Sequence, residues 1–235
     1  MRLQKYMAQC GLASRRKSEK MISQGLVKIN GKVVTKLGTT INPKIDIIKV
    51  NNKTIKMESR NIYIMLNKPS RYVTTLSDEQ DRKIVTDLIE GVKERIFPVG
   101  RLDMDTTGLL LLTNDGDITY KLTHPSQEIE KRYIAIVDGT PNRKALERFR
   151  KGLFLDGRKT APARVKILKN FTEDSILEIG IHEGRNRQVK RMCSTIGHPV
   201  KKLKRIALGE LELGDLRNGN WRYLNSREIE YLNKL

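Results

Sequence analysis

Apolar residues recur with helical spacing at the start of the chain. Four of them follow the i, i+3, i+4, i+7 pattern of one helix face: Leu3, Tyr6, Met7 and Cys10. This spacing predicts a short amphipathic helix that ends at Gly11, because glycine is common just after the last helical residue. Ser14 is a good N-cap residue, so we expect a second helix to begin there and to end at Gly25.

Short apolar runs separated by turn residues follow these helices. The dipeptide Asn30-Gly31 separates the runs at residues 27–29 and 32–34. It is the strongest short signal for a hairpin, because both turn positions require a positive φ. An isoleucine-rich run at residues 45–50 predicts another strand. Two short helices followed by small strands predict a compact α+β unit.

The rest of the chain contains several short runs typical of strands. We expect strands at residues 62–66, 109–112, 133–137, 163–167 and 176–181. Helices are predicted at about residues 142–151 and 186–196. Because strands and helices do not alternate regularly, we expect an α+β fold with a mixed, mainly antiparallel sheet flanked by helices.

Charge is distributed unevenly and divides the chain into two predicted domains. The 235 residues carry a formal net charge of +19, and residues 1–60 contribute +11 of it, from 14 Lys+Arg and 3 Asp+Glu. This indicates a small basic module ahead of a larger, more balanced domain. The polar stretch at residues 51–61 is the predicted hinge, and we place the domains at residues 1–58 and 59–235.

The basic composition indicates a polyanionic partner. A sequence pI of about 10.0 favours nucleic acid, with an anionic membrane surface as the other candidate. No run of about 18 apolar residues is present, so a transmembrane span is not expected. The first residues lack the apolar core of a signal peptide. Cys10 and Cys193 are too few and too far apart for a disulfide framework, and a reduced, cytoplasmic setting is expected.

Three consecutive cations, Arg15, Arg16 and Lys17, lie at the start of the second predicted helix. The helix dipole disfavours positive charge at that end, so the cluster indicates that an anion such as phosphate binds there. The alternative is a solvated basic surface without a ligand.

This first segment resembles the S4 RNA-binding domain. The resemblance rests on RLQKY at residues 2–6, GLASRRKSE at 11–19 and GLVKINGKV at 25–33. It implies RNA rather than DNA as the partner. The RNA-contacting residues that we expect in this domain are Arg2, Lys5, Ser14, Arg15, Arg16, Lys17, Lys28, Asn30 and Lys32.

The larger domain lacks the common cofactor and metal signatures. It contains no Walker-type phosphate loop and no GxGxxG after a predicted strand. The three histidines, His124, His182 and His198, have no ligand-like spacing, and we expect them to be structural or on the surface. We therefore expect no cofactor and no metal.

A block at residues 100–116 carries the most specific chemistry. Arg101, Asp103 and Asp105 precede a turn of small residues that leads into an apolar strand. A carboxylate held by backbone and close to a cation suits a nucleophile or a charge stabiliser at an electron-poor carbon. The alternative is a turn aspartate paired with a surface arginine.

Three motifs in order resemble the RNA pseudouridine synthases, specifically the RsuA/RluB branch. They are GRLD at the start of that block, EKRYIA at residues 130–135 and EGRNRQVKRM at 183–192. Flanking LNKP at 66–69, GHPV at 197–200 and LKR at 203–205 agree with it. The resemblance covers nearly the whole chain and implies a synthase domain that follows the S4 module.

The resemblance implies a role for each matching residue. Asp103 would be the catalytic aspartate, and Arg101 would enter the space that a flipped uridine leaves. Tyr133 would stack on the extruded base, although without the resemblance a buried strand aromatic would be the better interpretation. Lys190 would be the basic partner of Asp103. The same segment supplies three RNA-contact candidates, Arg185, Arg187 and Arg191. Arg187 and Arg191 could also pair with Asp103, because at positions i, i+3 and i+4 Arg187, Lys190 and Arg191 should lie near one helix face.

The resemblance also implies the reaction, the conversion of uridine in ribosomal RNA to pseudouridine without cofactor or metal. The third motif looks closer to the large-subunit type, which favours 23S over 16S ribosomal RNA. The alternatives are a 16S synthase and a non-enzymatic S4-containing ribosome-binding or assembly factor. We expect a monomer that acts on ribosomal RNA or a pre-ribosomal particle and has no membrane partner.

Overall fold

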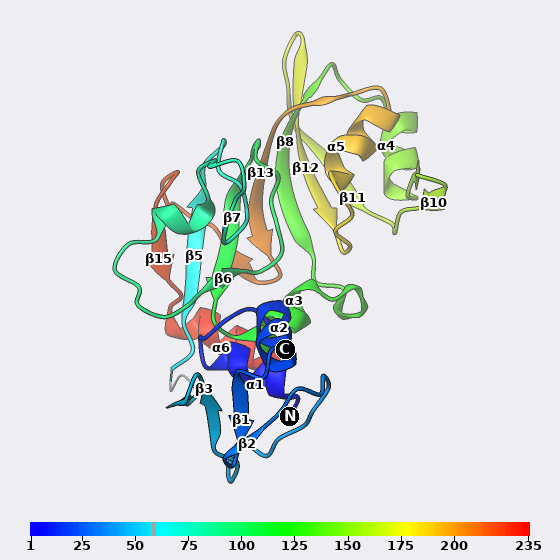
Figure 1. Ribbon diagram of the computed structural model, residues 1–235. Coiled ribbons are helices and arrows are strands. Elements are labelled where there is room, and N and C mark those ends of the chain that lie inside the picture. Colours follow the sequence, from blue (N-terminus) through cyan, green and yellow to red (C-terminus); the bar gives the residue numbers. More distant parts are fainter. Residues whose placement is uncertain (58–59) are drawn as a thin grey trace. The chain divides into compact units, whose positions relative to one another are not determined.

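The computed structural model describes residues 1–57 and 60–235 and forms two compact units (Figure 1). The first unit comprises Met1–Ile62 with Gly91–Ile96 and Asn114–Gly116, and the second comprises Tyr63–Glu90, Phe97–Thr113 and Asp117–Leu235. The predicted domain boundary between residues 58 and 59 lies outside the described residues. That boundary stays a prediction.

The first unit has two helices and a four-stranded antiparallel sheet in the order β2-β1-β3-β4. Its elements are α1 (Leu3–Gln9), α2 (Arg15–Ser23), β1 (Val27–Ile29), β2 (Lys32–Val33), β3 (Ile48–Val50) and β4 (Lys53–Thr54). Both helices and strands β1 and β3 contribute to one apolar core. The amphipathic pattern of the first helix is confirmed, since Leu3, Tyr6 and Met7 are buried there.

Two local signals in this unit are confirmed by backbone geometry. The Ser14 hydroxyl accepts a hydrogen bond from the Lys17 backbone N–H at 3.2 Å and caps α2. Asn30 and Gly31 both have positive φ, 49° and 83°, and form the turn between β1 and β2. Such a turn matches the right-handed twist of the paired strands.

Two predictions for this unit were wrong in detail. The strand expected at residues 45–50 is only β3, because Asp46 accepts hydrogen bonds from the Asn42 backbone at 2.7 Å and the Asn30 side chain at 2.8 Å. These bonds hold the segment in a turn and leave Ile45 73% exposed. The expected hinge also begins too early, because Asn51 forms part of the turn that joins β3 to β4.

The second unit is built on a nine-stranded sheet. Its strands are β5 (Tyr63–Lys68), β6 (Phe97–Pro98), β7 (Thr106–Thr113), β8 (Lys131–Asp138), β11 (Arg164–Asn170), β12 (Asp174–Ile181), β13 (Val200–Leu208), β14 (Leu211–Glu212) and β15 (Trp221–Tyr223). The main path runs β11-β12-β8-β13-β7-β5-β15, and β9 (Phe154–Leu155) and β10 (Arg158–Lys159) form a separate hairpin. All the pairs of the large sheet are antiparallel except β7 with β13, as expected for a mixed, mainly antiparallel sheet.

Four α-helices and two short 3₁₀ turns accompany this sheet. The helices are α3 (Gly116–Thr123), α4 (Arg143–Arg150), α5 (Gln188–Thr195) and α6 (Ser226–Lys234), and the 3₁₀ turns are Val85–Leu88 and Pro125–Gln127. Residues of α3 and α6 pack with β5 and β7 in one buried cluster. The predicted helices correspond to α4 and α5, whereas α3, α6 and β13 have no counterpart in the predictions.

The parallel pairing of β7 with β13 depends on Gly108. It has φ +103°, and a Cβ at this position would lie 2.1 Å from the backbone oxygen of Arg205. Any other residue would therefore separate the two strands. Glycine here lets the two central strands approach, and this brings the loop before β7 next to β13.

Among the described residues, no helix combines the length and the apolar character that a bilayer crossing requires.

Candidate active site

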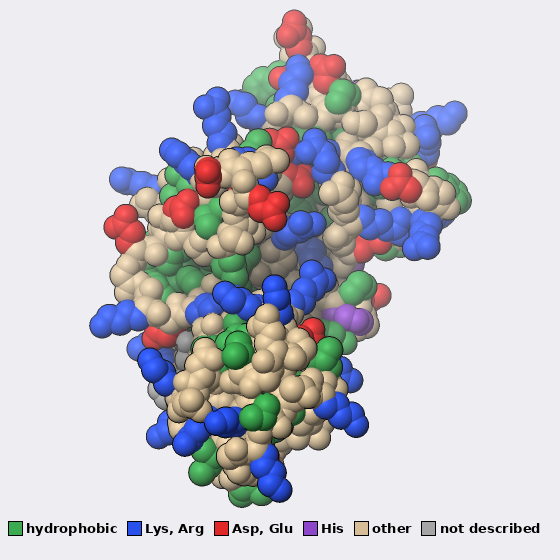
Figure 2. All heavy atoms as spheres, in the orientation of Figure 1, with side chains coloured by type: hydrophobic (Ala, Val, Ile, Leu, Met, Phe, Trp, Pro, Cys, Tyr) green, Lys and Arg blue, Asp and Glu red, His purple; other side chains and the backbone are tan. Residues whose placement is uncertain are grey.

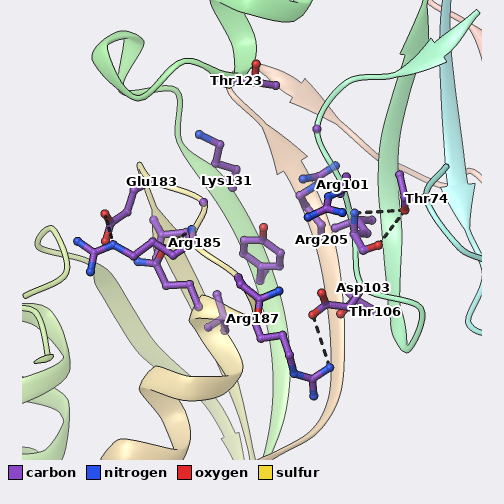
Figure 3. Close-up of a pocket in the computed structure, with 18 of the residues that line it drawn as sticks. Thr74, Arg101, Asp103, Thr106, Thr123, Lys131, Glu183, Arg185, Arg187 and Arg205 are labelled. Atoms are coloured by element: carbon purple, nitrogen blue, oxygen red, sulfur yellow. Dashed lines mark hydrogen bonds and ion pairs between the residues drawn. The ribbon is translucent and has the colours of Figure 1, made fainter. Parts of the chain in front are cut away.

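A cavity of about 520 Å³ opens on one face of the central strands β7, β8 and β13 (Figure 3). Strand residues on its floor include Thr106, Lys131, Tyr133, Leu203 and Arg205. Its walls are the loop at residues 99–104 and the segment at residues 181–189, which runs from the end of β12 to the start of α5. Its size falls within the range of about 300–1,000 Å³ typical of small-ligand sites, and the three sequence motifs meet around it.

Asp103 lies in the loop that enters β7, and its side chain is 30% exposed at the wall of this cavity. Its backbone carbonyl accepts a hydrogen bond from the Thr106 N–H at 3.0 Å. The carboxylate is thus held at the entrance of a rigid buried strand, as the sequence predicted. A group at a strand end is positioned more accurately than one in a long loop.

Lys68 anchors the loop that carries Asp103 through hydrogen bonds to its backbone. In the sequence it stood out only as part of the flanking LNKP motif. Its side chain is fully buried at the end of β5. The ammonium donates hydrogen bonds to the backbone carbonyls of Pro69 at 3.0 Å, Asp103 at 3.1 Å, Met104 at 3.3 Å and Thr106 at 3.0 Å. Burial lowers the pKa of Lys68 to about 8, although the charges of Asp105 and Asp103 act in the opposite direction.

The third motif brings two cations to the aspartates of the first. The Lys190 ammonium lies 3.5 Å from the Asp103 carboxylate. The Arg187 guanidinium lies 4.0 Å from it (Figure 3). Lys190 also donates a hydrogen bond to Asp105, and Arg187 lies 3.8 Å from Asp105. The carboxylates of Asp103 and Asp105 therefore share both cations.

Of the three candidates for pairing with Asp103, the structure places two near it and one with another partner. Lys190 and Arg187 both reach it, whereas Arg191 forms an ion pair with Asp156 at 2.5 Å. The expectation that all three share one helix face fails because α5 begins at Gln188. Arg187 precedes the helix with a positive φ of 49°.

Asp105 is a second carboxylate at the same loop. Partial burial raises its pKa, but the hydrogen bond from Lys190 and the charges of Lys190 and Arg187 outweigh burial and lower it overall. Its side chain is 58% exposed, so it faces solvent more than Asp103 does. Asp105 is thus a charged neighbour that competes for Lys190.

Tyr133 is both a buried strand residue and part of the cavity surface. Its ring is 9% exposed, and its strand pairs it with Arg205 on β13 and Ile179 on β12. Directly paired residues project to the same face of a sheet. The two interpretations of Tyr133, core aromatic and stacking platform, are therefore compatible.

Arg101 is exposed and lies on the loop that forms one wall of the cavity. The next residue fixes this loop: the buried hydroxyl of Thr74 donates to the Leu102 carbonyl at 2.8 Å and accepts from its N–H at 3.3 Å (Figure 3). Thr74 was not singled out in the sequence, because a lone threonine carries no motif. Its two hydrogen bonds fix the backbone of Leu102, the residue that joins Arg101 to Asp103.

The loop after β12 is held by its own polar residues. Arg185 donates to Glu183 at 3.1 Å and to the backbone carbonyls of Arg158 and Lys159 at 3.0 and 2.7 Å. Glu183 also accepts hydrogen bonds from Gln188 at 2.7 Å and from the Ala161 N–H at 2.9 Å. Arg185 was expected to contact RNA, and the structure shows its guanidinium engaged within the protein.

The RNA-contact candidates of the first unit lie mainly on its surface. Arg2, Arg15, Arg16, Lys17 and Lys32 are exposed, and Ser14 is used as the helix cap. Lys28 donates to Asn52 at 3.0 Å, and the Asn30 side chain donates to Asp46 and accepts from the Ile47 N–H. Lys5 is half-buried. Figure 2 shows Lys and Arg side chains over much of the face in view, with fewer acidic ones.

Within residues 1–57 and 60–235, no group of three or more His, Cys, Asp or Glu side chains is arranged to hold a metal ion.

Two family models match the chain in the order of its two units. A model described as S4 domain matches residues 1–44, and one described as RNA pseudouridylate synthase matches residues 62–195. A Bacillus subtilis (strain 168) protein named ribosomal large subunit pseudouridine synthase B is 46% identical, with 100% of this chain and 96% of that protein covered. An Aquifex aeolicus (strain VF5) protein named as an RNA pseudouridine synthase is 45% identical, covering 100% and 94%. A solved structure titled as a pseudouridylate synthase has a TM-score of 0.71 and 32% identity, and 99% of each chain is covered.

Proposed function

Because the chain belongs to the RNA pseudouridine synthase family, we propose that it isomerises uridine in ribosomal RNA and that Asp103 carries the chemistry. The observation that supports Asp103 most directly is its position. Its carboxylate is partly exposed at the cavity wall and lies near Lys190 and Arg187, and Lys68 holds its backbone carbonyl. The domains are proposed to be residues 1–58 and 59–235.

The reaction suits the groups that surround the cavity. Converting uridine to pseudouridine breaks the N1–C1′ bond, turns the base and joins C5 to C1′. C1′ becomes electron-poor when N1 leaves, and an ionised carboxylate stabilises or traps such a centre, as in glycoside hydrolysis. Lys190 and Arg187 place two positive charges within 4.0 Å of the Asp103 carboxylate. Attack at C1′ and removal of the C2′ proton both require this carboxylate.

The base has to leave the RNA stack to reach Asp103. Unstacking costs a few kcal/mol, and less in a loop or bulge. In the proposed complex the base stacks on Tyr133 and Arg101 fills the gap in the RNA. Both residues line the cavity that Asp103 borders.

Two further observations favour 23S ribosomal RNA. The third motif, EGRNRQVKRM, looks closer to the large-subunit type, and the name of the Bacillus subtilis relative specifies the large subunit. The +11 charge of residues 1–60 supports an RNA-binding role for the S4 module. We propose that the protein acts in the cytoplasm as a monomer, on free ribosomal RNA or on an assembly intermediate.

Release of tritium from C5-labelled uridine in 23S transcripts tests this function. Loss of the C5 proton accompanies formation of the C5–C1′ bond, so each turnover releases one label. We expect release from 23S transcripts and much less from 16S transcripts. Release from 16S alone would reassign the substrate, and RNA binding without release from either would indicate a non-enzymatic ribosome-binding factor.

The S4 module gives a prediction about salt dependence. Replacing Arg15, Arg16 and Lys17 together by Gln should weaken binding to 23S fragments. Each lost phosphate contact lowers the slope of log affinity against log salt by about 0.7 to 0.9. Filter binding between low and physiological salt measures this slope. The control replaces three exposed lysines of the same unit, Lys36, Lys44 and Lys53, and an equal effect of both triple variants would contradict a specific contact.

Arg101 gives a prediction about RNA structure. Arg101→Ala should slow single-turnover conversion about ten- to a hundredfold on a base-paired target, because holding the flipped state offsets a few kcal/mol of unstacking. The loss should shrink when the same uridine lies in a flexible loop, and it should not change with pH. A defect that eases as pH rises and ignores RNA structure would instead show that Arg101 acts on the ionisation of the active-site carboxylate.

A further inference from the structure

Arg205 is a buried cation on the cavity floor to which no role has been assigned above. It lies on β13 between the strands that carry the first and second motifs, and its side chain is 4% exposed. Its Nε–H donates to the Leu109 carbonyl at 2.7 Å, which fixes the guanidinium against β7. Its Nη2 is buried and has no hydrogen-bond partner among the described residues. Such a group is costly unless something pairs with it.

No carboxylate of the cavity balances this charge. Among the described lining residues, the carboxylates are those of Asp103 and Glu183. Asp103 faces Lys190 and Arg187, and Glu183 is occupied by Arg185, Gln188 and the Ala161 N–H. Arg205 forms no ion pair with a described acidic residue. Its charge is therefore available to whatever enters the cavity.

Lys131 adds a second positive charge to the same floor. It precedes Tyr133 by two positions on β8, so both side chains project to the same face of the sheet. Its ammonium donates to the His182 carbonyl at 3.1 Å, a neutral partner. Burial lowers the pKa of Lys131, and the nearby charge of Arg205 lowers it further. The floor is thus positive around Tyr133.

The register of the strands places these cations where the base would lie. Arg205 is the direct cross-strand partner of Tyr133, and Leu203, two positions earlier on β13, is the partner of Thr106 on β7. A uracil ring stacked on Tyr133 would have its edge toward the Arg205 side of the floor. A phosphate, in contrast, is bulky and hydrated, and reaches a nearly inaccessible guanidinium less readily than the edge of a planar ring does.

The reaction creates a negative charge on that ring. When the N1–C1′ bond breaks, the electron pair stays on N1 and spreads to the O2 and O4 carbonyl oxygens. This holds whether Asp103 attacks C1′ or removes the C2′ proton. The ring then turns and C5 bonds to C1′, while the Asp103–C1′ bond breaks or, on the other route, the proton returns to C2′. The C5 proton leaves and N1 gains a proton, so no atoms are gained or lost.

We propose that Arg205, assisted by Lys131, stabilises the detached uracil anion during this isomerisation. The proposal rests on the proposed function, because it requires that the cavity holds the reacting uridine. Donors that are fixed before the charge develops stabilise it without reorganisation, and they act more strongly in a dry site than in water. The buried Nη2 and the absence of a carboxylate partner suit this role, since a paired arginine would have little attraction left for the anion.

The test compares two RNA substrates in each variant. Transcripts are made with uridine or with 5-fluorouridine, whose electron-withdrawing fluorine already stabilises the departing base. Because 5-fluorouridine has no C5 proton to lose, the common readout is the single-turnover loss of the N1-linked nucleoside, measured by nuclease digestion and chromatography. We expect Arg205→Gln to slow conversion of uridine about 10²- to 10³-fold, as for removal of an oxyanion donor. On 5-fluorouridine the loss should be smaller by about tenfold or more, because a better leaving group depends less on the stabilising charge.

Further variants keep the test decisive if Arg205→Gln folds poorly. Arg205→Lys keeps the charge and should recover part of the rate on uridine, and Lys131→Gln should show the same selective defect at smaller size. Lys204→Gln is the matched control, because this exposed lysine is adjacent to Arg205 on β13 and projects to the other face. Lys204→Gln should lower the rate on both substrates only slightly and by the same factor.

Two results would overturn the inference. Equal losses on both RNAs with unchanged affinity would show that Arg205 only supports the fold of the cavity. Equal losses with weaker binding and a lower salt slope would show that it binds a backbone phosphate. The activity of the wild-type protein is measured before any variant is compared. If it converts uridine in no transcript, the proposed function is contradicted instead.

Discussion

Asp103→Asn should reduce pseudouridine formation by at least about 10⁴-fold while leaving RNA affinity within a few-fold. The amide has the size of the carboxylate but lacks the charge that an electron-poor C1′ requires. The hydrogen bonds from Lys68 go to the backbone carbonyl of Asp103 and are unaffected. Single-turnover kinetics, with binding measured separately, give the two quantities.

Asp105→Asn is the matched control for this experiment. Asp105 lies two residues away and shares Lys190 and Arg187 with Asp103, so the same cations are perturbed. We expect a loss of only about tenfold, because the remaining carboxylate keeps both partners. If Asp105→Asn were inactive and Asp103→Asn active, the catalytic assignment would move to Asp105.

Lys68→Met should have the second-largest effect. Four backbone carbonyls lose a donor. An unsatisfied buried group costs about 1–3 kcal/mol, but only the bond to the Thr106 carbonyl is fully buried and the other three are partly buried, so we expect a loss of stability of about 2–5 kcal/mol. The loop that carries Asp103 then loses its anchor, and a misplacement of about 1 Å can lower activity about 10²-fold. Denaturant unfolding and single-turnover kinetics at low temperature measure both effects.

The pH dependence of stability separates Lys68 from other lysines. Its pKa is lowered to about 8 in the folded protein from 10.5, so between these values the unfolded chain holds more protons. The unfolding free energy contributed by Lys68 therefore rises with pH through this window, and the rise is complete above it. The difference between wild type and Lys68→Met should grow from pH 8 to pH 10. Lys144→Met, an exposed lysine on α4, should show no such growth.

Local signals in the sequence predicted local structure well. Ser14 and Asn30-Gly31 act through their own backbone and nearest neighbours, so their cap and turn could be predicted without the rest of the fold. Ile45 was assigned to a strand because its neighbours are apolar, whereas the hydrogen bonds of Asp46 decide that segment. Periodicity contains no information on such polar contacts.

The motifs predicted the residues of the site, but not the residues that hold the site in place. Asp103, Tyr133 and Lys190 belong to three motifs, and the fold brings them to one cavity. Lys68 and Thr74 come from β5 and a loop, and they act through backbone carbonyls that any sequence supplies. Arg205 lies on β13, which the predictions did not include, and its burial depends on the close approach that Gly108 permits.

Mapping pseudouridine across ribosomal RNA tests the central claim most directly. RNA is compared from cells that carry the wild-type gene, a deletion, and the Asp103→Asn allele expressed at the wild-type level. The account predicts that one or a few 23S positions lose pseudouridine in the deletion and equally in the Asp103→Asn cells. Unchanged pseudouridine at every ribosomal position in both strains would contradict it.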